Sequence, residues 1–145
     1  MMAKIDADAV DMDTIQAVYP LPLPSHLTND GGILHIGGIP VTELAEQFGT
    51  PLYVTDETRI HALYYEYMHA VSSHYPHCRV LYAAKANGNI AILRTLASLG
   101  AGADVFSAGE LMLARDSGIR PEHLLFNGSS KTVLSIFSWI AIPIP

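Results

Sequence analysis

The chain has 145 residues, of which 50% are hydrophobic and 15% are charged, a composition typical of a globular domain rather than a disordered segment. Its formal net charge of −6 argues against a nucleic-acid-binding surface, and its single cysteine, Cys78, cannot form an internal disulfide. We therefore expect one domain with its own core, in a reducing compartment such as the cytoplasm.

The first part of the chain is predicted to be a loose lead-in followed by a small segment rich in strands. Residues 1–30 are acidic and then proline-rich, which favours extended chain. Within residues 31–56, two short apolar runs around a glycine pair predict a β-hairpin. A short helix capped by Thr42 and ended by Gly49 should follow, and then a strand over residues 51–55.

From residue 57 to 132, helical and strand patterns alternate. Apolar residues that step by three and one along 57–71 predict an amphipathic helix. The later predicted elements are a strand at 79–85, a helix at 90–99 capped by Asn89, a strand at 103–107, a helix at 108–116 and a strand at 123–128. Such short connections favour parallel strands with right-handed crossovers, and hence an α/β fold. It is either a doubly wound sheet or the opening of a (β/α)8 barrel.

Three polar residues, Lys85, Ser107 and Asn127, come at the ends of successive predicted strands. In α/β folds the functional groups gather at the carboxyl ends of the strands, so we expect these three to line one rim. An ammonium group there must reach water, find a counter-charge or lose its proton. Lys85 is therefore a candidate functional residue, and the alternative is a surface lysine that extends into solvent.

Two carboxylates lie close to this rim in the sequence. Asp104 sits inside an apolar strand, where a carboxylate needs a partner. If Asp104 and Glu110 both face the rim, their charges would hold the Lys85 amine. Ser107 and Glu110 also have the spacing of a capping box, which gives Glu110 a local structural role instead. The cluster of His69, His74 and His77 has no carboxylate or thiol in pattern with it, so we expect no metal site.

Two stretches, "YAAKAN" and "GADVFSAGEL", resemble the fold-type III pyridoxal-phosphate decarboxylases. The upstream "GILHIGGIPVTELAEQFGTPLYVTDE" is similar to the N-terminal segment of the diaminopimelate decarboxylases within that family. The likeness runs from Gly32 to Thr132. It implies a partial (β/α)8 barrel over residues 57–132, with residues 31–56 belonging to a β domain.

The resemblance also implies a cofactor and a set of site residues. Lys85 would bond covalently to the aldehyde of pyridoxal 5'-phosphate, Ala83 would lie against its ring, and Asp104 and Glu110 would lie close to both. The implied reaction is decarboxylation of meso-diaminopimelate to L-lysine by a homodimer. The alternatives are a related decarboxylase of the ornithine or arginine type, and a non-catalytic module that binds the cofactor or a partner.

The last predicted segment, residues 133–145, is apolar and uncharged, and it departs from the polar helix that the resemblance implies there. Its 13 residues fall short of the roughly 20 that span a bilayer. We expect a truncated or frame-shifted product. Because an incomplete barrel leaves a strand edge and inner surface uncovered, we expect the chain alone to self-associate and not to decarboxylate.

Overall fold

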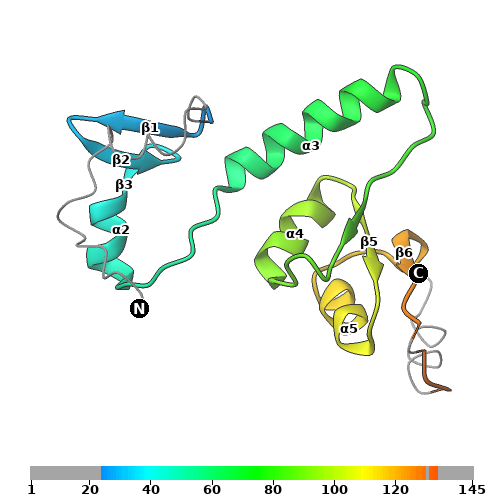
Figure 1. Cartoon of the computed structure of the whole chain (residues 1–145). Coiled ribbons are helices and arrows are strands. Elements are labelled where there is room, and N and C mark those ends of the chain that lie inside the picture. Colours follow the sequence, from blue (N-terminus) through cyan, green and yellow to red (C-terminus); the bar gives the residue numbers. More distant parts are fainter. Residues whose placement is uncertain (1–23, 130, 134–145) are drawn as a thin grey trace, which may run out of the picture. The chain divides into compact units, whose positions relative to one another are not determined.

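The computed structural model describes residues 24–129 and 131–133, and these divide after Arg59 into two compact units. The first unit holds a three-stranded antiparallel sheet in the order β1-β2-β3, followed by a helix (Figure 1). Its elements are β1 (Leu27–Asp30), β2 (Ile33–Ile36), β3 (Ile39–Pro40) and α2 (Val41–Phe48).

The predicted hairpin is confirmed as β2 and β3, which pair antiparallel with Ile36 opposite Ile39. Strand β1 was missed, because its sequence LTND has no apolar alternation and lies in the expected lead-in. The signal that could have found it is the Gly31-Gly32 pair. Both glycines have positive φ, the conformation that a tight two-residue turn between antiparallel strands requires.

Two further predictions for this unit are wrong. The cap of α2 is Pro40 and no side chain caps it, so Thr42 lies inside the helix instead of starting it. Residues 51–55 form no strand. Among the described residues no strand pairs with them, and Tyr53 is fully exposed, so their apolar composition alone was a misleading signal.

The long helix predicted from residue 57 is confirmed as α3 (Glu57–Ser72). Asp56 caps it: its Oδ1 accepts the Thr58 hydroxyl at 2.6 Å and the Thr58 and Arg59 backbone N–H groups at 2.9 and 3.3 Å. These hydrogen bonds, the Thr58 hydroxyl first among them, lower the pKa of Asp56. The described residues cover the apolar stripe of α3 only in part, since none of its side chains is fully buried and Ile60, Tyr64, Met68 and Val71 are half-buried.

The second unit contains a parallel sheet in the order β4-β5-β6, with helices between its strands (Figure 1). Its elements after α3 are β4 (Leu81–Ala83), α4 (Ile90–Ser98), β5 (Gly102–Val105), α5 (Ala108–Asp116), the 3-10 turn η2 (Pro121–His123) and β6 (Leu124–Phe126). This order confirms the alternation and the parallel strands predicted from the sequence. Among the residues that the structure describes, every helix is too short or too polar to cross a membrane.

The core of this unit lies between the two helices and one face of the sheet. Its buried members are Ala84, Leu93, Ala103, Val105, Leu111, Ala114, Ile119 and Leu124. Leu93 of α4 and Val105 of β5 are both fully buried. Burying a side chain of this size contributes about 1.5–3 kcal/mol, so these contacts fix how the strands lie against the helices.

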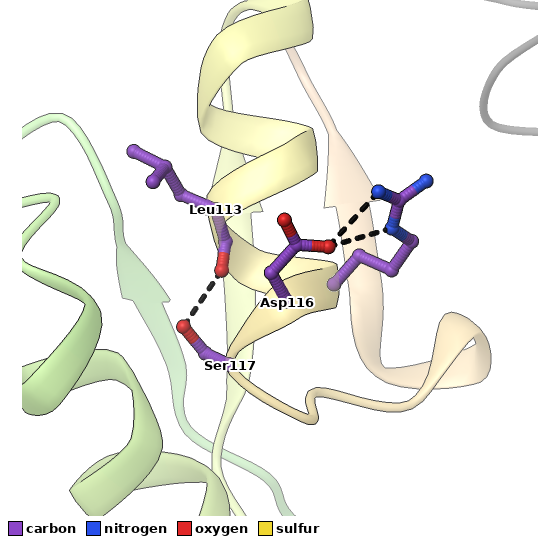
Figure 2. Close-up of polar contacts among 4 residues, drawn as sticks. Leu113, Asp116 and Ser117 are labelled. Atoms are coloured by element: carbon purple, nitrogen blue, oxygen red, sulfur yellow. Dashed lines mark hydrogen bonds and ion pairs between the residues drawn. The ribbon is translucent and has the colours of Figure 1, made fainter.

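Polar side chains cap the ends of α4 and α5, and one of them joins the two helices. The Asn89 side chain accepts a hydrogen bond from the Ala91 N–H at 2.9 Å, which confirms it as the cap of α4. At the carboxyl end of α5, the buried Ser117 hydroxyl donates to the Leu113 carbonyl at 2.6 Å (Figure 2). The neighbouring Asp116 instead forms an ion pair with Arg115 at the surface. Ser117 also reaches the Ile90 carbonyl at 3.5 Å, which ties the end of α5 to the start of α4.

His123 is buried at the amino end of β6, with 6% of its surface exposed. Its Nε2 lies 2.9 Å from Arg120 Nη2 and accepts a hydrogen bond from that guanidinium, which requires Nε2 to be unprotonated. Burial lowers the pKa of His123, the charges of Arg79 and Arg120 lower it further, and Glu122 opposes them. In barrel folds this end of the strands serves stability rather than chemistry.

Candidate functional site

The face of the sheet turned away from α4 and α5 carries the candidate residues. Strand pairing places Ala83 opposite Asp104, and Asp104 opposite Leu125, so the three form a row across the sheet. Tyr82, Ala103 and Leu124 contact the helical core, and side chains alternate along a strand. Ala83 and Asp104 therefore lie side by side on the open face, close to the carboxyl ends of their strands.

Lys85 follows β4 in a tight turn whose backbone is held on both sides. The Ala84 N–H donates to the Asp104 carbonyl at 3.0 Å, and the Ala86 N–H donates to the Ala83 carbonyl at 3.0 Å. The Lys85 side chain is exposed rather than enclosed. Its Nζ lies 4.3 Å from the centroid of the Phe106 ring, within the roughly 6 Å over which a cation and an aromatic face attract each other.

Asp104 carries a carboxylate oxygen that the fold leaves unpaired. Its Oδ1 is buried, and within residues 24–129 and 131–133 it has no hydrogen-bond partner. An unsatisfied buried polar atom costs about 1–3 kcal/mol, and more when it is charged. The free oxygen is therefore an acceptor that a bound ligand could satisfy.

Glu110 takes the local role that its spacing allowed. Its Oε1 accepts the Ser107 hydroxyl at 3.2 Å, its own N–H donates to Ser107 Oγ at 3.2 Å, and its Oε2 accepts the Phe106 N–H at 2.9 Å. In the part of the chain that is described, no ion pair joins Lys85 to Asp104 or Glu110. The expectation that both carboxylates hold the amine by charge is therefore not met. The oxygens of Glu110 serve the helix cap, and Lys85 contacts a ring instead.

The residue beside Lys85 at the next strand end is Phe106, not Ser107. Ser107 lies one position further on and begins α5. The Asn127 N–H donates to the Val105 carbonyl at 2.9 Å, so the pairing of β5 and β6 extends one residue past the strands. Phe106 was missed, although alternation along the strand places it on the same face as Asp104. That period-two spacing was the available signal.

The open face therefore presents groups that could act on a carbonyl compound. An amine without a carboxylate partner is a nucleophile for a carbonyl carbon once it is neutral. Ala83 offers a small surface, and Asp104 offers a free acceptor oxygen.

The sequence profile of the pyridoxal-dependent decarboxylases, in their pyridoxal-binding domain, matches residues 62–139, more than half of the chain. The chain belongs to this family. The match contains Lys85, Asp104 and Glu110, and it continues past Thr132, where we expected the likeness to end. The structure of residues 134–145 lies outside the described part of this decarboxylase-family chain.

Individual relatives agree with this assignment. The diaminopimelate decarboxylase of Methanothermobacter thermautotrophicus is 43% identical over 107 residues, which cover 74% of this chain and 25% of that protein. A crystal structure of the Methanocaldococcus jannaschii diaminopimelate decarboxylase with L-lysine is 42% identical with a TM-score of 0.76, covering 80% of this chain and 28% of that one. The lysine decarboxylase of Selenomonas ruminantium is 31% identical with a TM-score of 0.57, covering 66% and 25%.

The chain spans about a quarter of the length of these decarboxylases. The comparison confirms the predicted fold class, an α/β chain that forms part of a (β/α)8 barrel together with a segment of a β domain. The family's cofactor is pyridoxal phosphate. Two groups on the open face fit it: the Asp104 oxygen and the Lys85 amine, neither of which has a hydrogen-bond or carboxylate partner among the residues that the structure describes.

Proposed function

We propose that this chain provides the cofactor-binding lysine of a diaminopimelate decarboxylase, which releases CO2 from meso-diaminopimelate to form L-lysine. The observation that carries the proposal is an amine at the carboxyl end of β4, on the open sheet face, in a pyridoxal-binding family. The named relatives and the lysine-bound structure support the choice of substrate.

Each site residue has a separate part in this proposal. Lys85 would hold the cofactor, because its exposed amine could condense with the aldehyde carbon with loss of water. Ala83, opposite Asp104 in the sheet, would leave room for the ring, and the free oxygen of Asp104 would be available to accept a hydrogen bond from the cofactor. Bound pyridoxal phosphate supplies an aldehyde for amines and a ring that takes up the electrons left when CO2 departs.

The assignment of Lys85 can be tested by trapping. The chain is incubated with pyridoxal phosphate, reduced with borohydride and digested, and the labelled peptide is identified by mass. We expect the label on Lys85 and its loss in Lys85→Arg. Lys131→Arg is the matched control, because Lys131 Nζ already donates to the Gly128 carbonyl at 2.7 Å. Equal labelling of Lys85 and Lys131 in the unmodified chain would contradict the assignment.

The substrate can be tested in the same experiment. A substrate amine competes with Lys85 for the aldehyde, so it protects Lys85 from trapping. After correction for reaction with free cofactor, we expect meso-diaminopimelate to protect at lower concentration than L-ornithine or L-arginine. Equal protection by L-ornithine would favour a related decarboxylase, which the similarity to the lysine decarboxylase supports.

The partners of the working enzyme are also part of the proposal. The resemblance implies a homodimer and a small amino-acid substrate. The net charge of −6 gives no reason to expect nucleic acid. A cofactor-binding module without catalysis is the remaining alternative, and trapping on Lys85 without protection by any of the three amino acids would favour it.

A further inference from the structure

The Lys85 amine lies over the Phe106 ring. Lys85 Nζ is 4.3 Å from the ring centroid, and no ion pair in the described ranges draws it elsewhere. An aromatic face attracts a cation through the negative charge density above the ring. The direction of the exposed Lys85 side chain therefore depends on where the Phe106 ring lies.

The backbone of Phe106 is held from both sides. Its N–H donates to Glu110 Oε2 at 2.9 Å. Its carbonyl lies against Gly128 so closely that a Cβ on that glycine would collide with it. The preceding residue, Val105, is fully buried in the core. The ring is thus attached to a segment of backbone that is held in place. Among the described residues, Glu110 is the only charged side chain that forms a hydrogen bond with the Phe106 backbone.

We propose that Glu110 is a positioning residue that acts on the Lys85 amine through Phe106, and not through its own charge. Both of its oxygens are engaged, one by the Ser107 hydroxyl and one by the Phe106 N–H. A neutral glutamine oxygen could still accept the Phe106 N–H, although more weakly than a carboxylate. This inference deepens the proposed function and depends on it for the reason that the amine must be held in place.

The contact can be measured by nuclear magnetic resonance on the whole chain. The sequence contains three lysines, Lys4, Lys85 and Lys131, so ¹³C-lysine labelling gives three ε-methylene signals. A ring that lies over Lys85 should shift its signal upfield. We expect Phe106→Leu to remove this shift and Phe106→Tyr to keep it. An unchanged Lys85 signal in Phe106→Leu would overturn the contact.

Variants of Glu110 separate the two modes of action. If Glu110 acts through Phe106, Glu110→Gln keeps the Lys85 shift and Glu110→Ala loses at least half of it. Equal loss in both variants would mean that the charge acts directly, and equal retention would mean that Glu110 has no part. Ser107→Ala is the control for weakening the α5 cap: it removes the bonds of the Ser107 hydroxyl to Glu110 but not the bond that Glu110 Oε2 accepts from the Phe106 N–H.

A chemical measurement completes the test. In the borohydride experiment we expect Phe106→Leu to lower the labelling of Lys85 relative to Lys131 by about two- to fivefold, the range of an exposed cation–aromatic contact. A higher ratio would show that the ring only shields the amine, and would overturn the positioning role. If the unmodified chain shows no trapping on Lys85, the proposed function fails while the resonance experiment still decides the role of Glu110.

Discussion

Replacing Asp104 by asparagine should stabilise this chain while weakening its hold on the cofactor. The buried Oδ1 has no partner among the described residues. A buried unsatisfied polar atom costs about 1–3 kcal/mol, and more when charged. Asparagine keeps the shape and removes the charge, so we expect only part of this cost to be recovered, about 1 kcal/mol. For a domain of 60–100 residues that raises the melting temperature by about 4–8 °C.

The assay is thermal and urea unfolding followed by far-ultraviolet circular dichroism, together with trapping on Lys85. Asp116→Asn is the matched control. Asp116 is 49% exposed and pairs with Arg115 at 2.9 Å, so its loss should lower stability by less than about 1 kcal/mol. If Asp104→Asn is no more stable than the unmodified chain, the carboxylate has a partner in solution and our reasoning about the free oxygen is refuted. We expect trapping to fall in Asp104→Asn and to stay unchanged in Asp116→Asn.

Three further predictions concern the second unit. The pKa of His123 is lowered in the fold, so the unfolded chain binds more protons than the folded chain. The free energy of unfolding, measured by urea titration, should therefore fall as the pH drops below about 6.5. His123→Gln should lack this loss. A Cβ at Gly102 would collide with the His123 carbonyl, so Gly102→Ala should cost at least about 1–3 kcal/mol in thermal melts. Gly109→Ala is the helical control: its Cβ would meet only Ser107 Oγ at an ordinary contact distance of 3.9 Å, so it should stabilise the chain by about 0.5–1 kcal/mol. Leu81 and Leu125 of the open face are 39% and 46% exposed, so we expect the chain to self-associate in sedimentation velocity. Leu125→Lys should reduce this association. A monomeric unmodified chain would contradict the prediction.

The parallel unit could be predicted from the sequence because its signals are local. The cap at Asn89 and the cap at Ser107 depend on residues a few positions away, and both occur where the spacing placed them. The helix that begins at Glu57 was likewise predicted from its apolar steps. Each of these elements is specified within one stretch of chain.

The antiparallel unit was predicted less well because its strands depend on partners. Strand β1 has a polar sequence and exists through its pairing with β2, with Leu27 opposite Ile36. Residues 51–55 have the composition of a strand, but no strand in the described part of the chain pairs with them. A strand-like composition means that the residues would fit a pleated, half-buried surface. Whether such a surface forms depends on a partner strand elsewhere in the chain.

The residues of the candidate site also differ in whether local signals or strand pairing reveal them. Lys85 could be picked out because a charge that ends an apolar strand conflicts with its surroundings, and Asp104 stands out for the same reason. Phe106 conflicts with nothing, since an aromatic residue after a strand satisfies every local rule. Its importance arises only when strand pairing brings β4 beside β5 and places the ring under the amine. Residues that violate a local rule can therefore be found in a sequence, whereas residues that position them require the register of the sheet.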